Sequence, residues 1–278
     1  MARIRKNANS FRETDSTGTV ARMRNIPIAE VDTIDRPVLA IGTDYPPHHL
    51  LPTHRHRRAQ LLYGATGTMR VETADGTWTV PTHRAVLIPA HTDHQVTMDD
   101  VTTRSLYIEP GAAPWFPPRC QVVDVSPLLR ELLLDAVDIA PHYRRRSRDA
   151  ALIALILHEI NRLAPLPLDL PLPHHTRLRA LCADFLDAPH IHDPPARWAA
   201  RLHISQRTLN RLFHTETGMG FAAWRQRACV LHALTPLARG EPVTRIAARL
   251  GYDSPAAFST MFRRVLGAAP KDYRTPPR

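Results

Sequence analysis

The sequence predicts a multidomain protein of α and β structure: a small β-barrel in the N-terminal half, central helices, and an all-α C-terminal domain with two helix-turn-helix motifs. Three observations predict this fold class. Short apolar runs alternate with Pro and Gly after Pro37, whereas the apolar residues beyond Pro118 follow helical spacing. The 278 residues also exceed what one hydrophobic core comfortably serves.

The clearest predicted strands flank the dipeptide Asp75-Gly76. Met69 and Val71 alternate with polar residues before this dipeptide, and Trp78 resumes the alternation after it. Asp-Gly between alternating segments is a strong signal for a β-hairpin. Many short strands separated by turns indicate a sandwich or a small barrel. We expect Trp78 to lie in its core.

The pattern divides the chain into four parts. We expect a flexible basic tail, a small β-barrel, a helical connector with a linker, and an all-α domain with two helix-turn-helix motifs, at residues 1–25, 26–115, 116–175 and 176–278. The Pro-rich residues 164–173 are expected to be the interdomain linker. Two predicted helices, 126–138 and 145–163, could form a homodimer interface or pack on the barrel, and the sequence does not decide between these.

The net charge of +10 is concentrated at the two ends of the chain. Residues 176–278 carry a net charge of +9, residues 26–175 carry −3, and residues 1–25 carry +4. A basic C-terminal third indicates a polyanionic partner, because Lys and Arg that neutralise phosphates release condensed counterions. The alternative is that the charge only keeps the protein soluble.

Neither a membrane segment nor a disulfide framework is expected. The longest uninterrupted apolar run, Ala150 to Leu157, is far shorter than a membrane span, and the first residues lack the apolar segment of a signal peptide. We therefore expect a cytoplasmic protein. Cys120, Cys182 and Cys229 are odd in number and far apart, which argues against disulfides and against a C-x-x-C metal site.

The first predicted helix-turn-helix lies between residues 196 and 217. Ser205 is placed as the N-cap of its second helix, and Leu209 and Phe213 form the inner face. The outer face carries Gln206, Arg207, Asn210 and Arg211. No acidic residue interrupts it, unlike a typical solvated face, and Arg and Asn are the side chains that pair with guanine and adenine in the major groove.

A second unit follows a predicted long helix over residues 221–239, which would span about 28 Å. Ser254 caps the second candidate recognition helix. Its candidate DNA-contacting residues are Ser259, Thr260, Arg263 and Arg264. The first two side chains are short, whereas the two arginines are better placed to contact phosphates.

Residues 176–276 resemble the AraC/XylS family of bacterial transcription regulators. The matching motifs include Ala199-Ala200-Arg201-Leu202, Thr208-Leu209-Asn210-Arg211-Leu212-Phe213, Glu216-Thr217-Gly218, Ile246-Ala247, Leu250-Gly251-Tyr252, Phe262-Arg263-Arg264 and Tyr273-Arg274. The resemblance implies sequence-specific binding to double-stranded promoter DNA, with Arg207, Asn210 and Arg211 facing the major groove. The second recognition helix departs from the pattern, because Pro255 and Ala256 stand where relatives often carry longer polar side chains.

Seven of the 16 histidines fall between His48 and His94. On a strand, the pair His54-x-His56 would point both rings to one face, and His94 from a neighbouring strand would complete a set suited to Zn, Ni, Fe or Mn. The pattern resembles the cupin barrel, which many AraC-type regulators carry N-terminally. Gln60 replaces the usual Glu of that motif, and His91 stands where Gly is common.

Two interpretations of these side chains remain open: His54, His56, Gln60 and His94 either hold a divalent metal or line the pocket of a small-molecule effector without one. We expect a transcription regulator and not an enzyme. One alternative is a metal-dependent cupin enzyme, a dioxygenase or an isomerase, with a DNA-binding tail. Another is an architectural DNA protein that is indifferent to sequence.

Overall fold

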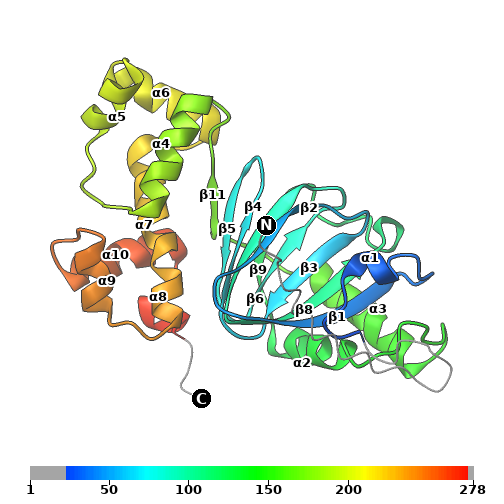
Figure 1. The fold of residues 1–278 in the computed structure, drawn as a ribbon. Helices are drawn as coiled ribbons and strands as arrows, with labels where there is room; N and C mark the ends of the chain where they lie inside the picture. The colour runs from blue at the N-terminus through cyan, green and yellow to red at the C-terminus, as the bar shows by residue number, and fades with distance from the viewer. Residues whose placement is uncertain (1–22, 275–278) are drawn as a thin grey trace, which may run out of the picture.

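The computed structural model describes residues 23–274. A β-rich N-terminal part and a helical C-terminal part follow one another in the chain (Figure 1), which confirms the predicted fold class. The strands form two facing antiparallel sheets and do not close into a barrel. One sheet has the order β1-β8-β3-β6-β9-β10, and the other has the order β11-β5-β4-β7-β2.

The strands of both sheets are short, with two to eight residues each. The first sheet contains β1 (Val38–Tyr45), β8 (Val101–Ile108), β3 (Ala59–Gly64), β6 (Arg84–Ile88), β9 (Gln121–Asp124) and β10 (Pro165–Leu166). The second contains β11 (Asp169–Pro171), β5 (Gly76–Val80), β4 (Thr68–Glu72), β7 (His94–Asp99) and β2 (His49–His54). The predicted Asp75-Gly76 hairpin is β4–β5, closed by a hydrogen bond from Thr73 N–H to Gly76 O of 2.9 Å.

The inner faces of the two sheets pack against each other. Leu62 and Ile88 of the first sheet share a core with Met98 and Trp78 of the second. Trp78 is 7% exposed, so it lies in the core as predicted. Every residue of β3 is buried, because helices cover the outer face of its sheet as well.

Those helices are α2 (Pro127–Ala136) and α3 (Arg148–Asn161). The helical spacing of their apolar residues predicts both helices. Ser126 and Ser147 cap them by accepting hydrogen bonds from backbone N–H groups. Their apolar residues pack on the outer face of the first sheet together with Leu61 and Leu106. Short elements complete this part: α1 (Ile28–Val31) and the 3₁₀ turn η1 (Pro110–Ala112).

The predicted linker at residues 164–173 is not a free connection, because it forms β10 and β11. Leu166 pairs with Val122, and Leu170 pairs with Thr77. Both strands lie at sheet edges, where the prolines of this segment can be accommodated because an edge strand needs partners on one side only.

The C-terminal part is a helical domain with two helix-turn-helix units. Its elements are α4 (Thr176–Asp187), α5 (Pro195–Leu202), α6 (Gln206–Thr217), α7 (Phe221–His232), α8 (Leu234–Ala238), α9 (Val243–Arg249), α10 (Pro255–Leu266) and η2 (Pro270–Tyr273). The predicted N-caps are confirmed: Ser205 Oγ accepts a hydrogen bond from Thr208 N–H, and Ser254 Oγ accepts one from Ala257 N–H, each of 3.1 Å.

The prediction of one long helix over 221–239 is wrong. The helix ends at His232, and α8 restarts after Ala233. Pro236 explains the break, because a proline lacks the N–H that would bond the carbonyl of His232 and its ring clashes with that carbonyl. The first segment of 12 residues therefore spans only about 18 Å.

The two parts of the chain are joined by contacts as well as by sequence. Trp224 of α7 is fully buried, and its indole Nε1–H donates to Pro171 O of β11 at 2.8 Å. The core that contains Leu170 continues to Trp224. Asp99 and Arg239 form an ion pair between β7 and the end of α8.

The predicted tail at residues 1–25 lies almost entirely outside the described residues. Its last residues are ordered against β1: Met23 is 2% exposed, and Asn25 N–H donates to Gly42 O at 2.8 Å. Within residues 23–274, no helix combines the length and the apolar character needed to cross a membrane.

Candidate functional site

Three histidines meet at one end of the two sheets. His54 is the last residue of β2 and lies directly opposite His94, the first residue of β7. His56 lies in the segment that crosses from β2 to β3, so it does not share a strand with His54 as the spacing predicted. The chain crosses from one sheet to the other over residues 55–58, the segment that contains His56. The ring centroids of His54 and His94 are 4.3 Å apart, and those of His56 and His94 are 5.2 Å apart.

Backbone carbonyls fix the orientation of all three rings. Each Nδ1 lies 2.6–2.8 Å from a carbonyl oxygen, and since such an oxygen only accepts, each Nδ1 must carry the proton. The accepting oxygens belong to Pro52, Arg58 and Thr92. One ring nitrogen of each histidine lies within 4.8 Å of those of the other two. Hydrogen bonds of this kind orient metal-binding histidines in general.

Gln60 of β3 completes the group from the opposite sheet. Its side-chain Oε1 lies 3.1 Å from His56 Nε2. The amide nitrogen donates to Ser105 Oγ at 3.3 Å and to Tyr107 Oη at 3.2 Å. These two bonds to β8 turn the carbonyl oxygen of Gln60 towards the histidines.

The donor set fits a metal ion. His94 Nε2 is buried and has no hydrogen-bond partner among the described residues. Burial lowers the pKa of His94 to about 4 and also lowers the pKa of His56, so both rings are neutral at neutral pH. Neutral imidazole nitrogens are ligands for Zn, Ni and Fe. His54, His56 and His94, with Gln60 beside them, are therefore the residues that could hold the ion implied by the cupin resemblance.

A cavity of about 330 Å³ opens next to this group, a size suited to a small molecule. Of the predicted residues, His54, His94 and Gln60 line it, together with the polar Ser105 and Tyr107, whereas His56 is not among the residues that line it. The remaining wall is largely apolar and includes Ile26, Ile28, Ile41, Leu51, Val96 and Met98. No Asp, Glu, Lys or Arg lines it within the part of the chain that the structure describes.

Some cavity residues were not identified from the sequence. Ser105 and Tyr107 face the cavity, whereas Leu106 and Ile108 face the helices, so the alternation along β8 could have indicated the pair. Asn25 to Ile28 also line the cavity, and they carry no periodic signal.

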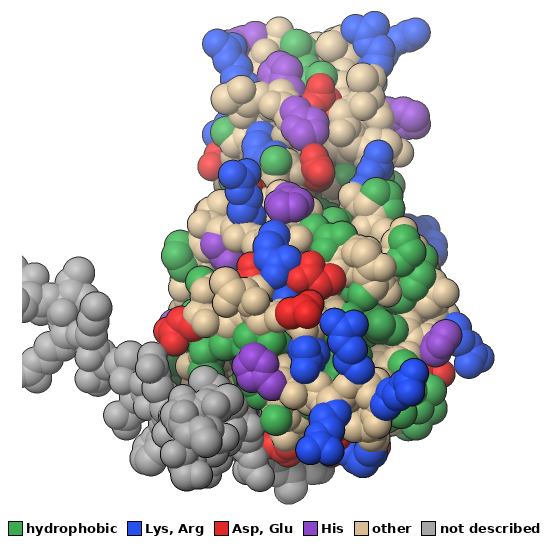
Figure 2. Space-filling model, turned by 90° about the vertical axis from the view of Figure 1, so that its right-hand side faces the viewer, with side chains coloured by type: hydrophobic (Ala, Val, Ile, Leu, Met, Phe, Trp, Pro, Cys, Tyr) green, Lys and Arg blue, Asp and Glu red, His purple; other side chains and the backbone are tan. Residues whose placement is uncertain are grey.

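The outer face of α6 is exposed. Gln206, Arg207, Asn210 and Arg211 are all exposed, and none of their side chains makes a hydrogen bond or ion pair with the described residues 23–274. The inner face of α6 is packed into the core, because Leu209 and Phe213 of this helix are fully buried. In Figure 2, basic side chains stand at the edges of the narrow upper end of the molecule, where Figure 1 places α4, α5 and α6.

The candidate DNA-contacting side chains of α10 differ in whether they are hydrogen-bonded within the protein. Ser259 Oγ donates to Pro255 O of its own helix at 2.8 Å. Arg264 is tied to α7 by a hydrogen bond of 2.8 Å to Gln226 Oε1. Arg263 and Thr260 are exposed, and no partner is found for Arg263 among the described residues. The arginines are therefore not equivalent.

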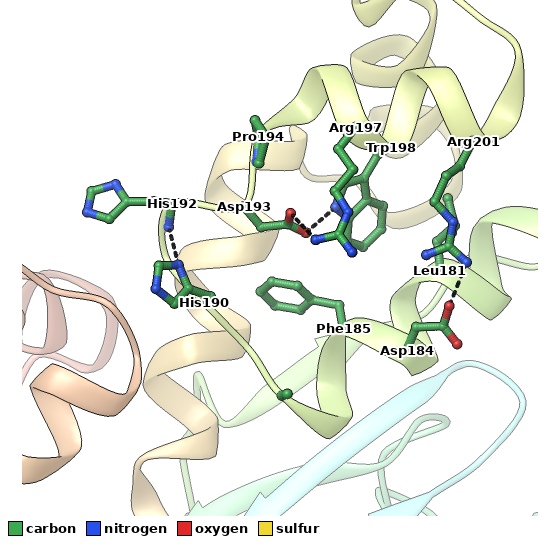
Figure 3. A pocket seen from close by; sticks show the side chains of 11 residues that line it. Leu181, Asp184, Phe185, His190, His192, Asp193, Pro194, Arg197, Trp198 and Arg201 are labelled. Atoms are coloured by element: carbon green, nitrogen blue, oxygen red, sulfur yellow. Dashed lines mark hydrogen bonds and ion pairs between the residues drawn. The ribbon is translucent and has the colours of Figure 1, made fainter.

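A groove between α4 and α5 is polar but internally satisfied (Figure 3). Asp193 accepts hydrogen bonds from the Trp198 indole and from Arg197, and Arg201 pairs with Asp184 at 2.8 Å. These bonds hold the first helix of the first helix-turn-helix in place. We assign no ligand to this groove.

Comparison with known families gives a match in each half of the chain. Residues 37–164 match the model of the AraC-like ligand binding domain, and residues 198–276 match a helix-turn-helix domain. The HTH-type transcriptional regulator NimR of Escherichia coli is 33% identical over 226 residues, which cover 80% of this chain and 81% of that protein. The HTH-type transcriptional regulator RipA of Corynebacterium glutamicum is 32% identical over 107 residues, 38% of this chain and 32% of RipA.

Among solved structures, the apo form of a Lys-to-Ala variant of ToxT from Vibrio cholerae aligns with 86% of this chain and 97% of its own, at 12% identity and a TM-score of 0.37. The DNA-binding domain of the global transcriptional factor AdpA, in complex with a target DNA, is 34% identical over 34% of this chain and 86% of its own, with a TM-score of 0.32.

Proposed function

Because the chain belongs to the AraC/XylS family of DNA-binding transcription regulators and carries an AraC-like ligand-binding domain, we propose that α6 reads promoter bases and that the histidine cavity binds the effector. The protein is a regulator and not an enzyme, so the dioxygenase or isomerase alternative is set aside.

The exposed face of α6 has the side chains and the spacing needed to contact bases. Arg207, Asn210 and Arg211 lie at i, i+3 and i+4, so they share one face of the helix, and no acid or intramolecular partner competes for them within the described residues. Arg can bond guanine bidentately, and Asn can bond adenine in the same way. Gln206, at the start of the helix, extends this face.

In the second unit, α10 contributes mainly phosphate contacts. Ser259 and Thr260 are short, and the hydroxyl of Ser259 is engaged with its own helix. Arg263 is free to bind a phosphate, which positions a protein without reading sequence. Arg264, tied to Gln226, supports the packing of α10 on α7.

We further propose that two copies associate through α2 and α3 in the cytoplasm. Leu128 of α2 is 51% exposed and Leu155 of α3 is 41% exposed, and this helix pair thus carries two of the three large apolar side chains that are exposed within the described residues. A second copy that covers both leucines would remove this surface from water. Sedimentation of the wild type and of Leu155→Glu tests this proposal, since only the wild type should dimerise.

Selection of binding sites from random double-stranded DNA tests the DNA-binding proposal. The full chain should enrich one consensus, and the double variant Arg207→Ala/Asn210→Ala should lose it. The control is Arg162→Ala, which removes an exposed arginine of the N-terminal ligand-binding domain (the sensor domain, residues 37–164). This variant should enrich the same consensus. Equal recovery of all sequences by the wild type would contradict the proposal and favour an architectural DNA protein.

A further inference from the structure

The ligand set at the histidine cavity is electrically neutral, and this bears on what the cavity can bind. His54, His56 and His94 offer nitrogens, and Gln60 offers an amide oxygen. A divalent ion held by these groups would keep its full charge of +2. An uncompensated charge in a buried site is costly, so such a site favours an anionic partner.

Two observations at the histidines point to a bound cation: a buried nitrogen without a partner and a pair of facing acceptor atoms. His94 Nε2 is buried without a partner among the described residues, which is rare for a buried polar atom. His56 Nε2 and Gln60 Oε1 face each other at 3.1 Å. His56 Nδ1 already carries the ring proton, because it donates to Arg58 O. In this orientation of the Gln60 amide the facing atoms both present lone pairs, and either a cation between them or a half-turn of the amide removes the conflict.

Two acidic groups that act electrostatically on the histidines, Asp32 and Asp93, are already engaged with arginines. Asp32 is ion-paired with Arg57 and with Arg58, whose side chain is fully buried. Asp93 is 67% exposed and lies 3.9 Å from Arg55. The described part of the cavity wall contains no carboxylate.

We propose that His54, His56, His94 and Gln60 hold a divalent transition-metal ion and leave its charge for the effector, which is a carboxylate with an apolar body. This inference rests on the proposed effector cavity and names the class of molecule that the cavity takes. The carboxylate lies at the ion, and the apolar body lies against Ile41, Val96 and Met98. Gln60 determines that the effector is an anion, because a Glu at this position would itself supply the negative charge that balances the metal ion.

The metal is tested with Co²⁺ and the full chain, prepared without a polyhistidine tag and stripped with a chelator. Visible absorption should report about one bound Co²⁺ per chain, and His94→Ala should weaken binding by about tenfold or more. His158→Ala, an exposed histidine of α3, is the matched control and should bind as the wild type does. Circular dichroism checks that each variant is folded. Wild-type protein without stoichiometric Co²⁺, or His94→Ala with unchanged affinity, overturns the proposal.

The effector class is tested on the Co²⁺-loaded protein with acetate, butyrate and octanoate, and with octanamide as a neutral analogue. Affinity should rise with chain length, the carboxylates should shift the Co²⁺ bands, and octanamide should not. Gln60→Glu should keep Co²⁺ but bind octanoate about tenfold more weakly. Equal binding of octanamide, equal binding by metal-free protein, or no binding along the series overturns the proposal. DNA binding is measured on the same samples, so loss of specific DNA binding would count separately against the proposed function.

Discussion

Asp99, the last residue of β7, forms an ion pair with Arg239, which directly follows α8. The same strand begins at His94, so β7 connects the histidine cavity to the DNA-binding domain. The side chain of Asp99 is 13% exposed and that of Arg239 is 53% exposed. Solvent screening keeps the contribution of such a pair to stability small, so its importance lies in where it holds α8.

Arg239→Ala should loosen α8 from the sensor domain. Without the ion pair, α8 still packs near β4 but loses its charged contact with β7. We expect hydrogen exchange of backbone amides in residues 234–238 and 95–99 to become several-fold faster, because local opening needs less free energy. Arg148→Ala, which removes an ion pair with Asp135 inside the sensor domain, is the control and should leave both segments unchanged.

Trp224 makes the second test of the contact between the domains. Trp224→Phe keeps a large apolar ring but removes the donor to Pro171 O. A hydrogen bond contributes about 0.5–1.5 kcal/mol to stability, and this one is partly buried, so urea unfolding should show a loss of at least this size because the smaller ring also removes packing. Trp115→Phe changes a partly exposed tryptophan and should cost much less. Equal losses would mean that the hydrogen bond does not contribute.

The three cysteines should be unreactive in the native protein. All are buried, and burial raises the pKa of Cys120 and of Cys229 to about 12, while that of Cys182 is raised further. Because the thiolate is the nucleophile, iodoacetamide at pH 8 should label none of them until urea is added. Rapid labelling of any one in the folded protein would contradict their burial.

Features that depend on neighbouring residues could be predicted from the sequence. Ser205 and Ser254 were identified as N-caps because capping needs only the next helical turn. The Asp75-Gly76 hairpin is local in the same sense. The break at Pro236 was also present in the sequence, but the apolar residues on both sides suggested a continuous helix.

Features that depend on distant contacts could not be predicted. The Pro-rich composition of residues 164–173 predicts a linker, whereas the sheet edges next to β9 and β5 allow this segment to pair as two edge strands. The histidine site was predicted as a set of residues, but the placement of His54 at the end of a strand and of His56 in the segment that crosses to the other sheet was not. The bond of Arg264 to Gln226 joins residues 38 positions apart.

The two arginines of α10 should therefore behave differently. Arg263→Ala should weaken binding to all DNA sequences alike and lower the slope of log affinity against log salt by about one unit, because one phosphate contact is lost. Arg264→Ala should mainly reduce stability, since it removes the contact with Gln226. Titrations at several salt concentrations, together with urea unfolding, separate the two. A lower salt slope for Arg264→Ala alone would reverse the assignment.

Arg211 should determine base preference in one half of the binding site. Its guanidinium is exposed on α6, and no partner within residues 23–274 restrains it. A bidentate contact to guanine contributes about 1–3 kcal/mol of discrimination, so Arg211→Ala should flatten the preference at about one base pair and leave the other half of the site unchanged. Binding to a panel of single-base operator variants measures this, with Arg263→Ala as the comparison that keeps the preference. If both variants relaxed the preference equally, α10 would also read bases, and the unequal roles assigned to α6 and α10 would be wrong.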